Sequence, residues 1–218
     1  QYKEKINLPF FCLTSPLTIN REKLEILVNV GLTTVQMGLQ TGSDRLNKEI
    51  YLRNISSGDF LKAMRLLESY HKIKVLLDAI GDNPYETQED ILKSLEVLNQ
   101  LKRGFNLGLY SLVFYPGTEL YNRAAKDNKL KNFEEYLSKE YHIFKPTYLN
   151  KVIYLIPYLE ATKIKEFVDK RNDLFARISL ELLFFIYMKK NKIPLWLLIF
   201  LSKIKKMFKK INLIPNSM

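Results

Sequence analysis

The sequence predicts an α/β fold: a partial parallel (β/α) barrel, TIM-like and of about four βα units, with an α-helical C-terminal extension. Two observations favour this class. Short apolar or β-branched runs alternate with amphipathic helical segments over residues 1–130, and single helices between strands indicate parallel crossovers. The runs also carry apolar residues on both faces, which is typical of a sheet covered on both sides.

The predicted elements follow one another in a regular order. Strands are expected at Leu8–Leu13, Thr33–Gln40, Ile73–Ile80 and Leu107–Phe114. Helices are expected at 19–31, 56–70, 87–102 and 117–128. Pro16 ends the first strand, and Gly31 ends the first helix. Ser56 or Ser57 caps the second helix, while Thr87, with Asp90 three residues later, forms a variant of the capping box at the third.

Composition narrows the class of protein. The 218 residues carry a net charge of +11, but residues 189–218 hold eight lysines and no acid, which leaves +3 for residues 1–188. The single cysteine, Cys12, excludes a disulfide framework and any multi-cysteine metal site supplied by this chain alone. It fits a reducing compartment, so a cytoplasmic location is predicted. His71 and His142 are far apart in the sequence and predict no metal site.

Polar segments follow each predicted strand: "TSP", "QTGSD", "GDNPYET" and "YPGTE". In a parallel α/β architecture the carboxyl ends of the strands form the edge where ligands bind. Alternation places Gln36, Gly38 and Gln40 on one face of the second strand, which is poorly suited to helix packing. We therefore expect these residues and Asp78 to face a polar chamber. The alternative is that Asp78 only caps the following turn.

Three segments of the sequence resemble motifs of a known protein family. "VQMGLQTGSDRLNKEIYLRNIS", "LLDAIGDNPYETQEDILKSLEVL" and "LGLYSLVFYPGTELYNRA" resemble the second half of the radical S-adenosylmethionine (SAM) core domain, in the right order and spacing. The likeness covers about Leu8 to Leu130 and is greatest to the branch that also carries a cobalamin-binding domain. Residues 1–130 are accordingly assigned to the C-terminal part of such a barrel, and residues 131–218 to a helical extension with a basic amphipathic tail.

The resemblance implies a chemistry. In that family, three cysteines of a CxxxCxxC loop hold a [4Fe–4S] cluster, and the remaining iron binds the amino and carboxylate groups of SAM. Reductive cleavage of SAM yields a 5′-deoxyadenosyl radical, which abstracts hydrogen from a small-molecule substrate. Cobalamin is a further cofactor in the cobalamin-associated branch.

Carried over residue by residue, the resemblance implies these roles. Gln40 and Ser43 contact polar groups of SAM, Arg53 pairs with its carboxylate, and Asp78 accepts the ribose hydroxyls. Gly81 shapes the adenine side by close backbone approach. The adenine and substrate end is lined by Tyr110, Tyr115 and Pro116 within the segment up to Thr118. For Arg53 the alternative is a solvated charge at the end of a helix.

The chain departs from the family in one respect. It has no CxxxCxxC segment and none of the strands that should carry it. We therefore interpret it as a truncated C-terminal portion, partnered by a missing N-terminal segment, and expect it alone to assemble no cluster and cleave no SAM. One alternative is a catalytically inert half-barrel that acts as an interaction or scaffold module. Another is an unrelated α/β-barrel enzyme using Asp78 as acid or base.

The C-terminal extension is predicted to be helical. Its apolar runs, Leu180–Met188 and Ile193–Leu201, are too short to span a bilayer. A basic helix over 193–211, with Trp196 and Phe200, could make peripheral contact with an anionic membrane, or it could pack on the barrel with its lysines in solvent. No RNA-binding module is visible, so nucleic-acid binding is not predicted.

Overall fold

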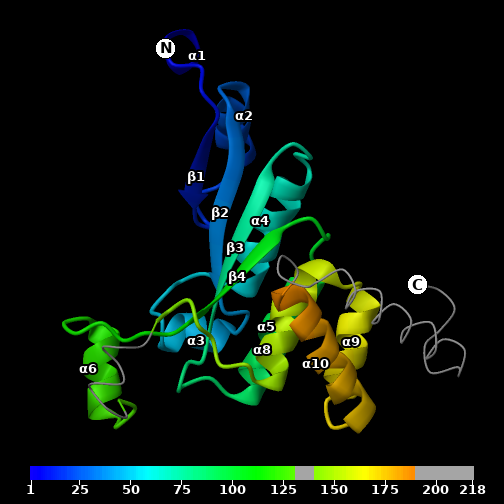
Figure 1. Cartoon of the computed structure of the whole chain (residues 1–218). Helices are drawn as coiled ribbons and strands as arrows, with labels where there is room; N and C mark the ends of the chain where they lie inside the picture. The colour runs from blue at the N-terminus through cyan, green and yellow to red at the C-terminus, as the bar shows by residue number, and fades with distance from the viewer. Residues whose placement is uncertain (131–139, 190–218) are drawn as a thin grey trace, which may run out of the picture.

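The core of the molecule is a four-stranded parallel sheet with the strand order β1-β2-β3-β4. A computed structural model describes residues 1–130 and 140–189 (Figure 1). The strands are β1 (Phe10–Thr14), β2 (Leu32–Gln40), β3 (Lys74–Gly81) and β4 (Asn106–Ser111). Sequential parallel strands joined by helices confirm the predicted partial (β/α) barrel with a helical extension.

Helices connect the strands and continue after them. Those of the barrel part are α1 (Tyr2–Lys5), α2 (Arg21–Asn29), α3 (Asp44–Glu49), α4 (Ser57–Glu68), α5 (Gln88–Asn99) and α6 (Glu119–Lys126). The extension contains α8 (Tyr148–Leu155), the 3-10 turn η1 (Ile156–Tyr158), α9 (Ala161–Asp169) and α10 (Leu174–Met188). The short helix α1 was not among the predicted elements, whereas α3 is the short helix expected before Arg53. The predicted basic helix over 193–211 lies outside the described residues.

The predicted helix caps are confirmed. Ser56 caps α4 and Thr87 caps α5, each in a full capping box whose third residue is an aspartate, Asp59 or Asp90. The residue after the cap of α2, Gly31, has a φ of 113°, a conformation that glycine adopts without a steric penalty. These local signals fix where each helix begins or ends, and so where each loop begins.

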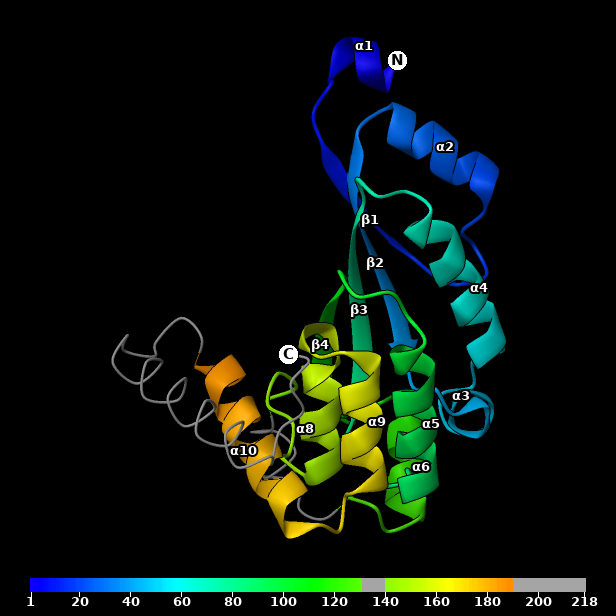
Figure 2. The same cartoon turned by 90° about the vertical axis from the view of Figure 1, so that its right-hand side faces the viewer.

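One face of the sheet is buried beneath helices α2, α4, α5 and α8 (Figures 1 and 2). Burial alternates along β2 and β3 with period two, as expected for a sheet with one covered face. The buried positions include Val35, Met37, Leu77 and Ala79. The residues between them, including Gln36 and Asp78, lie half-buried on the opposite face.

The helical extension shares the same hydrophobic core as the sheet. Residues of α8, α9 and α10, such as Val152, Phe167 and Leu180, are buried in one cluster with the sheet side chains. Asp82 joins the two parts, because its carboxylate accepts hydrogen bonds from Ser111 Oγ at 2.8 Å, the backbone N–H of Lys145 at 2.7 Å and Asn150 Nδ2 at 3.0 Å. The division at residue 130 stays a prediction, since residues 131–139 lie outside the described ranges.

The last strand is shorter than predicted. We expected it to reach Phe114, but β4 ends at Ser111. Leu112 and Phe114 are buried with Ala124 of α6 in a small second cluster. The backbone N–H of Leu112 still donates to the carbonyl oxygen of Gly81 at 3.0 Å, but the side chains of Leu112 and Phe114 pack against α6.

The first strand leaves an edge of the sheet open. β1 pairs only with β2, and no strand of the described chain pairs with its other side. Its side chains Phe11 and Leu13 are 55% and 71% exposed, although both are large and apolar. An uncovered edge with apolar side chains is a surface that natural sheets usually protect.

Candidate functional site

The half-buried face of the sheet carries an aspartate between two glycines. Gly38 of β2, Asp78 of β3 and Gly108 of β4 are direct cross-strand partners. Side chains on the two neighbouring strands would normally flank the Asp78 carboxylate, but glycine has no side chain, so the space on both sides is left to other residues. The sequence predicted Gly38 and Asp78 on a common face, and the register confirms that they are partners.

Two longer side chains fold over these glycines. A Cβ added at Gly38 would overlap Gln40 Nε2, so the amide of Gln40 lies in the space above residue 38. A Cβ added at Gly108 would meet Cε2 and the hydroxyl of Tyr110 at 2.7 Å. Gln40 and Tyr110 therefore approach Asp78 from either side, and both glycines are needed for that arrangement.

The end of β2 is bent by a bulge. The register slips between Gly38 and Gln40, and Gln40 has a φ of 63°, in the left-handed region that a glutamine rarely adopts. Bulges near the ends of strands often redirect a side chain. Here the bulge coincides with the amide of Gln40 lying back over Gly38.

Gln36 and Tyr110 define the polarity around Asp78. Gln36 Nε2 donates to Asp78 Oδ2 at 2.7 Å. Burial and then the charge of Asp78 raise the pKa of the Tyr110 phenol, which therefore stays protonated. The carboxylate thus has an amide donor on one neighbouring strand and a phenol on the other.

Arg53 reaches the same strand end from the loop after α3. Its guanidinium lies 3.4 Å from the carbonyl oxygen of Leu39 and 3.5 Å from that of Gly38. Burial lowers the pKa of Arg53, and no carboxylate pairs with it among residues 1–130 and 140–189. The preceding residue, Leu52, has a φ of 50°. Arg53 is therefore a half-buried cation without an acidic partner, and it follows a residue in the left-handed region. Such a guanidinium is suited to bind an anionic ligand.

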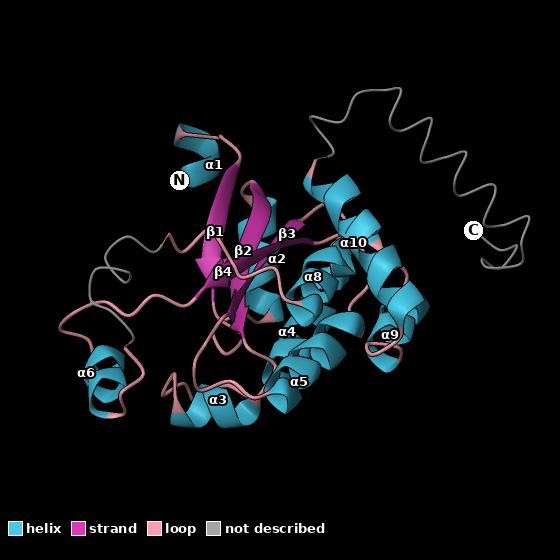
Figure 3. Ribbon diagram, turned by 60° about the horizontal axis from the view of Figure 1, so that its bottom comes forward, coloured by secondary structure: helices cyan, strands magenta, loops and turns pink. Residues whose placement is uncertain are grey.

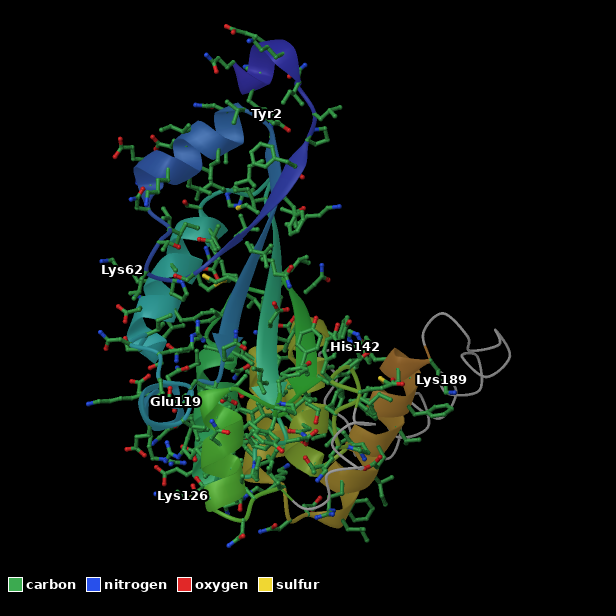
Figure 4. The ribbon with its side chains drawn as sticks, turned by 90° about the vertical axis from the view of Figure 1, so that its left-hand side faces the viewer. Tyr2, Lys62, Glu119, Lys126, His142 and Lys189 are labelled. Carbon is green, nitrogen blue, oxygen red and sulfur yellow. The ribbon has the colours of Figure 1, made fainter. Side chains whose placement is uncertain are left out.

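An aromatic pair that the sequence did not suggest lies beside β4. The backbone N–H of Ser111 donates to the carbonyl oxygen of Tyr141 at 2.8 Å, which places residues 141 and 142 along the strand. The ring centroids of Tyr141 and His142 lie 5.9 and 6.1 Å from that of Tyr110. His142 is labelled in Figure 4. No sequence signal linked His142 to this face, because the contact depends on a loop after residues 131–139.

Other predicted site residues lie elsewhere. The hydroxyl of Ser43 is buried and donates to Asp90 Oδ1 at 2.5 Å. Gly81 is on the covered face, where a Cβ would meet Asn150 and Leu109. Tyr115 and Pro116 lie exposed in the loop before α6. The structure therefore brings Gln40, Arg53, Asp78 and Tyr110 to one strand edge, and the ligand roles of all eight residues stay predictions.

Asp90 supports the loop that follows β2. Its carboxylate, at the start of α5, accepts hydrogen bonds from Ser43 Oγ, Thr87 Oγ1 and Arg45 Nη2. The hydrogen bonds from these three side chains outweigh burial and hold the pKa of Asp90 well below its usual range. Figure 3 shows α3 and α5 adjacent at this end of the sheet. The network fixes the turn between Gln40 and Arg53.

Glu86 gives a pH-dependent prediction. Burial, followed by the charges of Asp90 and Asp82, raises the pKa of Glu86 to about 8. The folded chain thus binds a proton that the unfolded chain releases above about pH 4.5, so wild-type stability falls as the pH rises towards 8. We expect Glu86→Gln to stabilise the fold by at least about 1 kcal/mol at the upper end of this range and little at the lower end.

Urea denaturation of the wild type and Glu86→Gln across that pH range provides the measurement. Glu96→Gln, on the exposed side of α5, is the matched control and should change stability equally little at every pH. Parallel pH profiles for Glu86→Gln and the wild type would contradict the prediction.

A [4Fe–4S] cluster does not fit the residues of this chain. Cys12 is the only cysteine, and burial raises the pKa of its thiol, which disfavours the thiolate that metals bind. In the described ranges no three His, Cys, Asp or Glu side chains are grouped so as to hold a metal ion. SAM does fit the polar set: it presents hydroxyls for Asp78 and a carboxylate for Arg53.

Comparison with known proteins addresses the family. The model of the radical SAM superfamily matches residues 1–98. No curated protein matched the chain. Solved structures with a similar fold include the radical SAM methyltransferase TsrM from Kitasatospora setae (18% identity, TM-score 0.45, 54% of this chain and 23% of that one). Coproporphyrinogen III oxidase HemN from Escherichia coli matches at 16% identity and TM-score 0.46, over 59% of this chain and 29% of that one.

A third similar structure is archaeal Elp3 from Methanocaldococcus infernus, with 23% identity, a TM-score of 0.47 and coverage of 59% of this chain and 30% of that one. The chain spans less than a third of the length of each of these three proteins. The motif resemblance, over about Leu8 to Leu130, overlaps the match of the family model but extends beyond it. Residues 1–98, slightly less than half of the chain, are similar to the radical SAM superfamily.

Proposed function

We propose that this chain forms the C-terminal part of a radical SAM enzyme and supplies the side of the SAM site that binds adenosine and the methionine carboxylate. The observation that carries the proposal is the Gly38–Asp78–Gly108 row, with Gln40 and Tyr110 beside it and Arg53 at the same strand end. Asp78 offers a hydrogen-bond acceptor and Arg53 a cation without an acidic partner. A ligand that has several hydrogen-bond donors and one carboxylate matches this arrangement.

Each residue has a separate role in the proposal. Asp78 accepts both ribose hydroxyls, and Gln36 orients its carboxylate through the 2.7 Å hydrogen bond. Arg53 forms a bidentate pair with the methionine carboxylate, for which a partly desolvated guanidinium is suited. Gln40 and Tyr110 move off Gly38 and Gly108 to admit the ligand, because both side chains occupy the space directly beside Asp78.

The cluster must come from polypeptide outside these 218 residues, because the sequence holds one cysteine. When bound beside a reduced cluster, SAM supplies radical chemistry that abstracts hydrogen from an organic substrate. We place that substrate on the side of Tyr110, where Tyr141 and His142 add further ring surface. Cobalamin remains a prediction from the motif strings alone.

Binding of SAM to the chain tests the proposal. We expect Asp78→Asn to weaken SAM binding at least about tenfold, because an amide accepts hydrogen bonds from the ribose less strongly than a carboxylate does. An NMR titration of the 218-residue chain with SAM measures this, since the method detects weak binding. Asp169→Asn, on the exposed side of α9, is the matched control and should bind as the wild type does.

Two outcomes count against the proposal in different ways. Equal SAM affinity of Asp78→Asn and the wild type would remove Asp78 from the site. No shift of any resonance by SAM in the wild type would favour the scaffold interpretation, because a half-barrel that only binds other proteins needs no adenosine site.

A further inference from the structure

Helix α10 has an apolar stripe that faces solvent. Six large apolar side chains recur at helical spacing on its outer side and are 43–67% exposed. One exposed acid, Glu181, lies among them and pairs with Lys151. We call this set the outer stripe of α10: Leu174, Phe175, Ile178, Leu182, Phe185 and Met188. Singly exposed apolar residues are common, but a contiguous row along one helix marks an interaction surface.

The opposite side of α10 already has its partners. Ala176 and Leu180 are buried in the main core, and Phe184 contacts Phe144 and Tyr154 at ring-centroid distances of 6.2 and 5.4 Å. The helix lies outside α8 and α9, away from the sheet (Figures 2 and 3). The outer stripe is therefore not needed to attach α10 to the molecule.

The sequence after α10 decides which partner suits the stripe. Residues 189–218 carry eight lysines and no acid, directly following the last exposed side chain of the stripe. A second copy of the chain would bring two such +8 segments together, which is electrostatically unfavourable. An anionic lipid surface would instead attract the lysines while the stripe enters the boundary between headgroups and acyl chains.

We infer that the outer stripe of α10 docks on an anionic membrane surface, in the plane of the interface. The inference is independent of the proposed SAM site. Within the described ranges no helix is long and apolar enough to cross a bilayer. The 15 residues of α10, apolar on both sides, are instead suited to lie on one, with Arg177 flanking the stripe.

Vesicle flotation with the full 218-residue chain tests the inference. We expect binding to phosphatidylcholine vesicles that contain phosphatidylserine, weak binding to phosphatidylcholine alone, and release as the salt concentration is raised. The triple variant Phe175→Ser, Ile178→Ser, Leu182→Ser should bind anionic vesicles at least about tenfold less tightly. The matched control is the pair Leu17→Ser and Ile26→Ser, which are similarly exposed near α2 and should bind as the wild type does.

Three results would overturn the inference. The first is absence of wild-type binding to anionic vesicles, and the second is unchanged binding of the triple variant, which would leave the stripe covered by another part of the chain. The third is a dimer of the wild type, seen by light scattering, that the triple variant converts to a monomer. That result would assign the stripe to a second copy. Circular dichroism of each variant establishes that the fold is retained.

Discussion

Replacing Asp90 with alanine is expected to destabilise the fold by about 3 kcal/mol at neutral pH. Asp90 is only 2% exposed, and its carboxylate accepts hydrogen bonds from Ser43, Arg45 and Thr87. The substitution removes the second half of the capping box of α5 and leaves the buried hydroxyl of Ser43 without its acceptor. Arg45 is 39% exposed and adds little, because water screens its charge.

The effect of Asp90 should depend on pH. Because its folded pKa is depressed, the charged carboxylate stabilises the fold fully above its unfolded pKa of about 4, and this contribution is lost as the pH falls through the lower folded value. Urea denaturation of the wild type and Asp90→Ala at neutral and acidic pH measures both effects. Glu89→Ala, at the exposed neighbouring position, is the control, and a similar loss for the two variants would contradict the prediction.

Replacing Gly42 with valine is expected to cost about 3 kcal/mol or more. A Cβ at this position would lie 2.6 Å from Ser94 Cα and 2.7 Å from the carbonyl oxygen of Lys93, both on the backbone of α5. The contact cannot relax by rotating a side chain, so the loop after β2 must move away from α5. That movement breaks the 2.8 Å hydrogen bond from the Gly42 N–H to Ser94 Oγ.

Thermal unfolding compares Gly42→Val with Gly58→Ala. Gly58 lies in the first turn of α4, where an added Cβ would meet only Ser56 Oγ, at an ordinary contact distance of 3.6 Å, so alanine should stabilise that helix by up to about 1 kcal/mol. The two glycines therefore predict changes of opposite sign. A melting temperature for Gly42→Val equal to that of the wild type would show that the loop and α5 are less closely packed than described.

Much of the fold could be predicted because its signals are local. Short apolar or β-branched runs located β2 and β3, and Ser56 and Thr87 marked the helix starts by capping chemistry. The end of β4 could not be predicted in this way, since the apolar residues Leu112 and Phe114 pack against α6, which follows later in the chain. Over a segment as short as 112–114, the apolar pattern of a strand cannot be distinguished from that of side chains packed in a small second core.

The candidate site was only partly accessible from the sequence. Alternation placed Gln36 and Asp78 on one face, and their hydrogen bond agrees with that placement. Alternation could not show that Gly108 would complete the row or that His142 would come near Tyr110, because both depend on the pairing of distant segments. Ser43 lies in the same polar segment after β2 as Gln40, so the sequence does not distinguish them. The hydroxyl of Ser43 nevertheless donates to Asp90 of α5 and not towards Asp78.

The open edge of β1 has a geometric consequence for the site. Parallel strands all end at the same rim of a sheet, so a parallel strand that paired with β1 would deliver its following loop to the rim that carries Gln40 and Arg53. Its side chains would also shield Phe11 and Leu13 from water. Completion of the hydrogen-bond ladder at β1 would therefore also bring further chain to the rim beside Gln40 and Arg53.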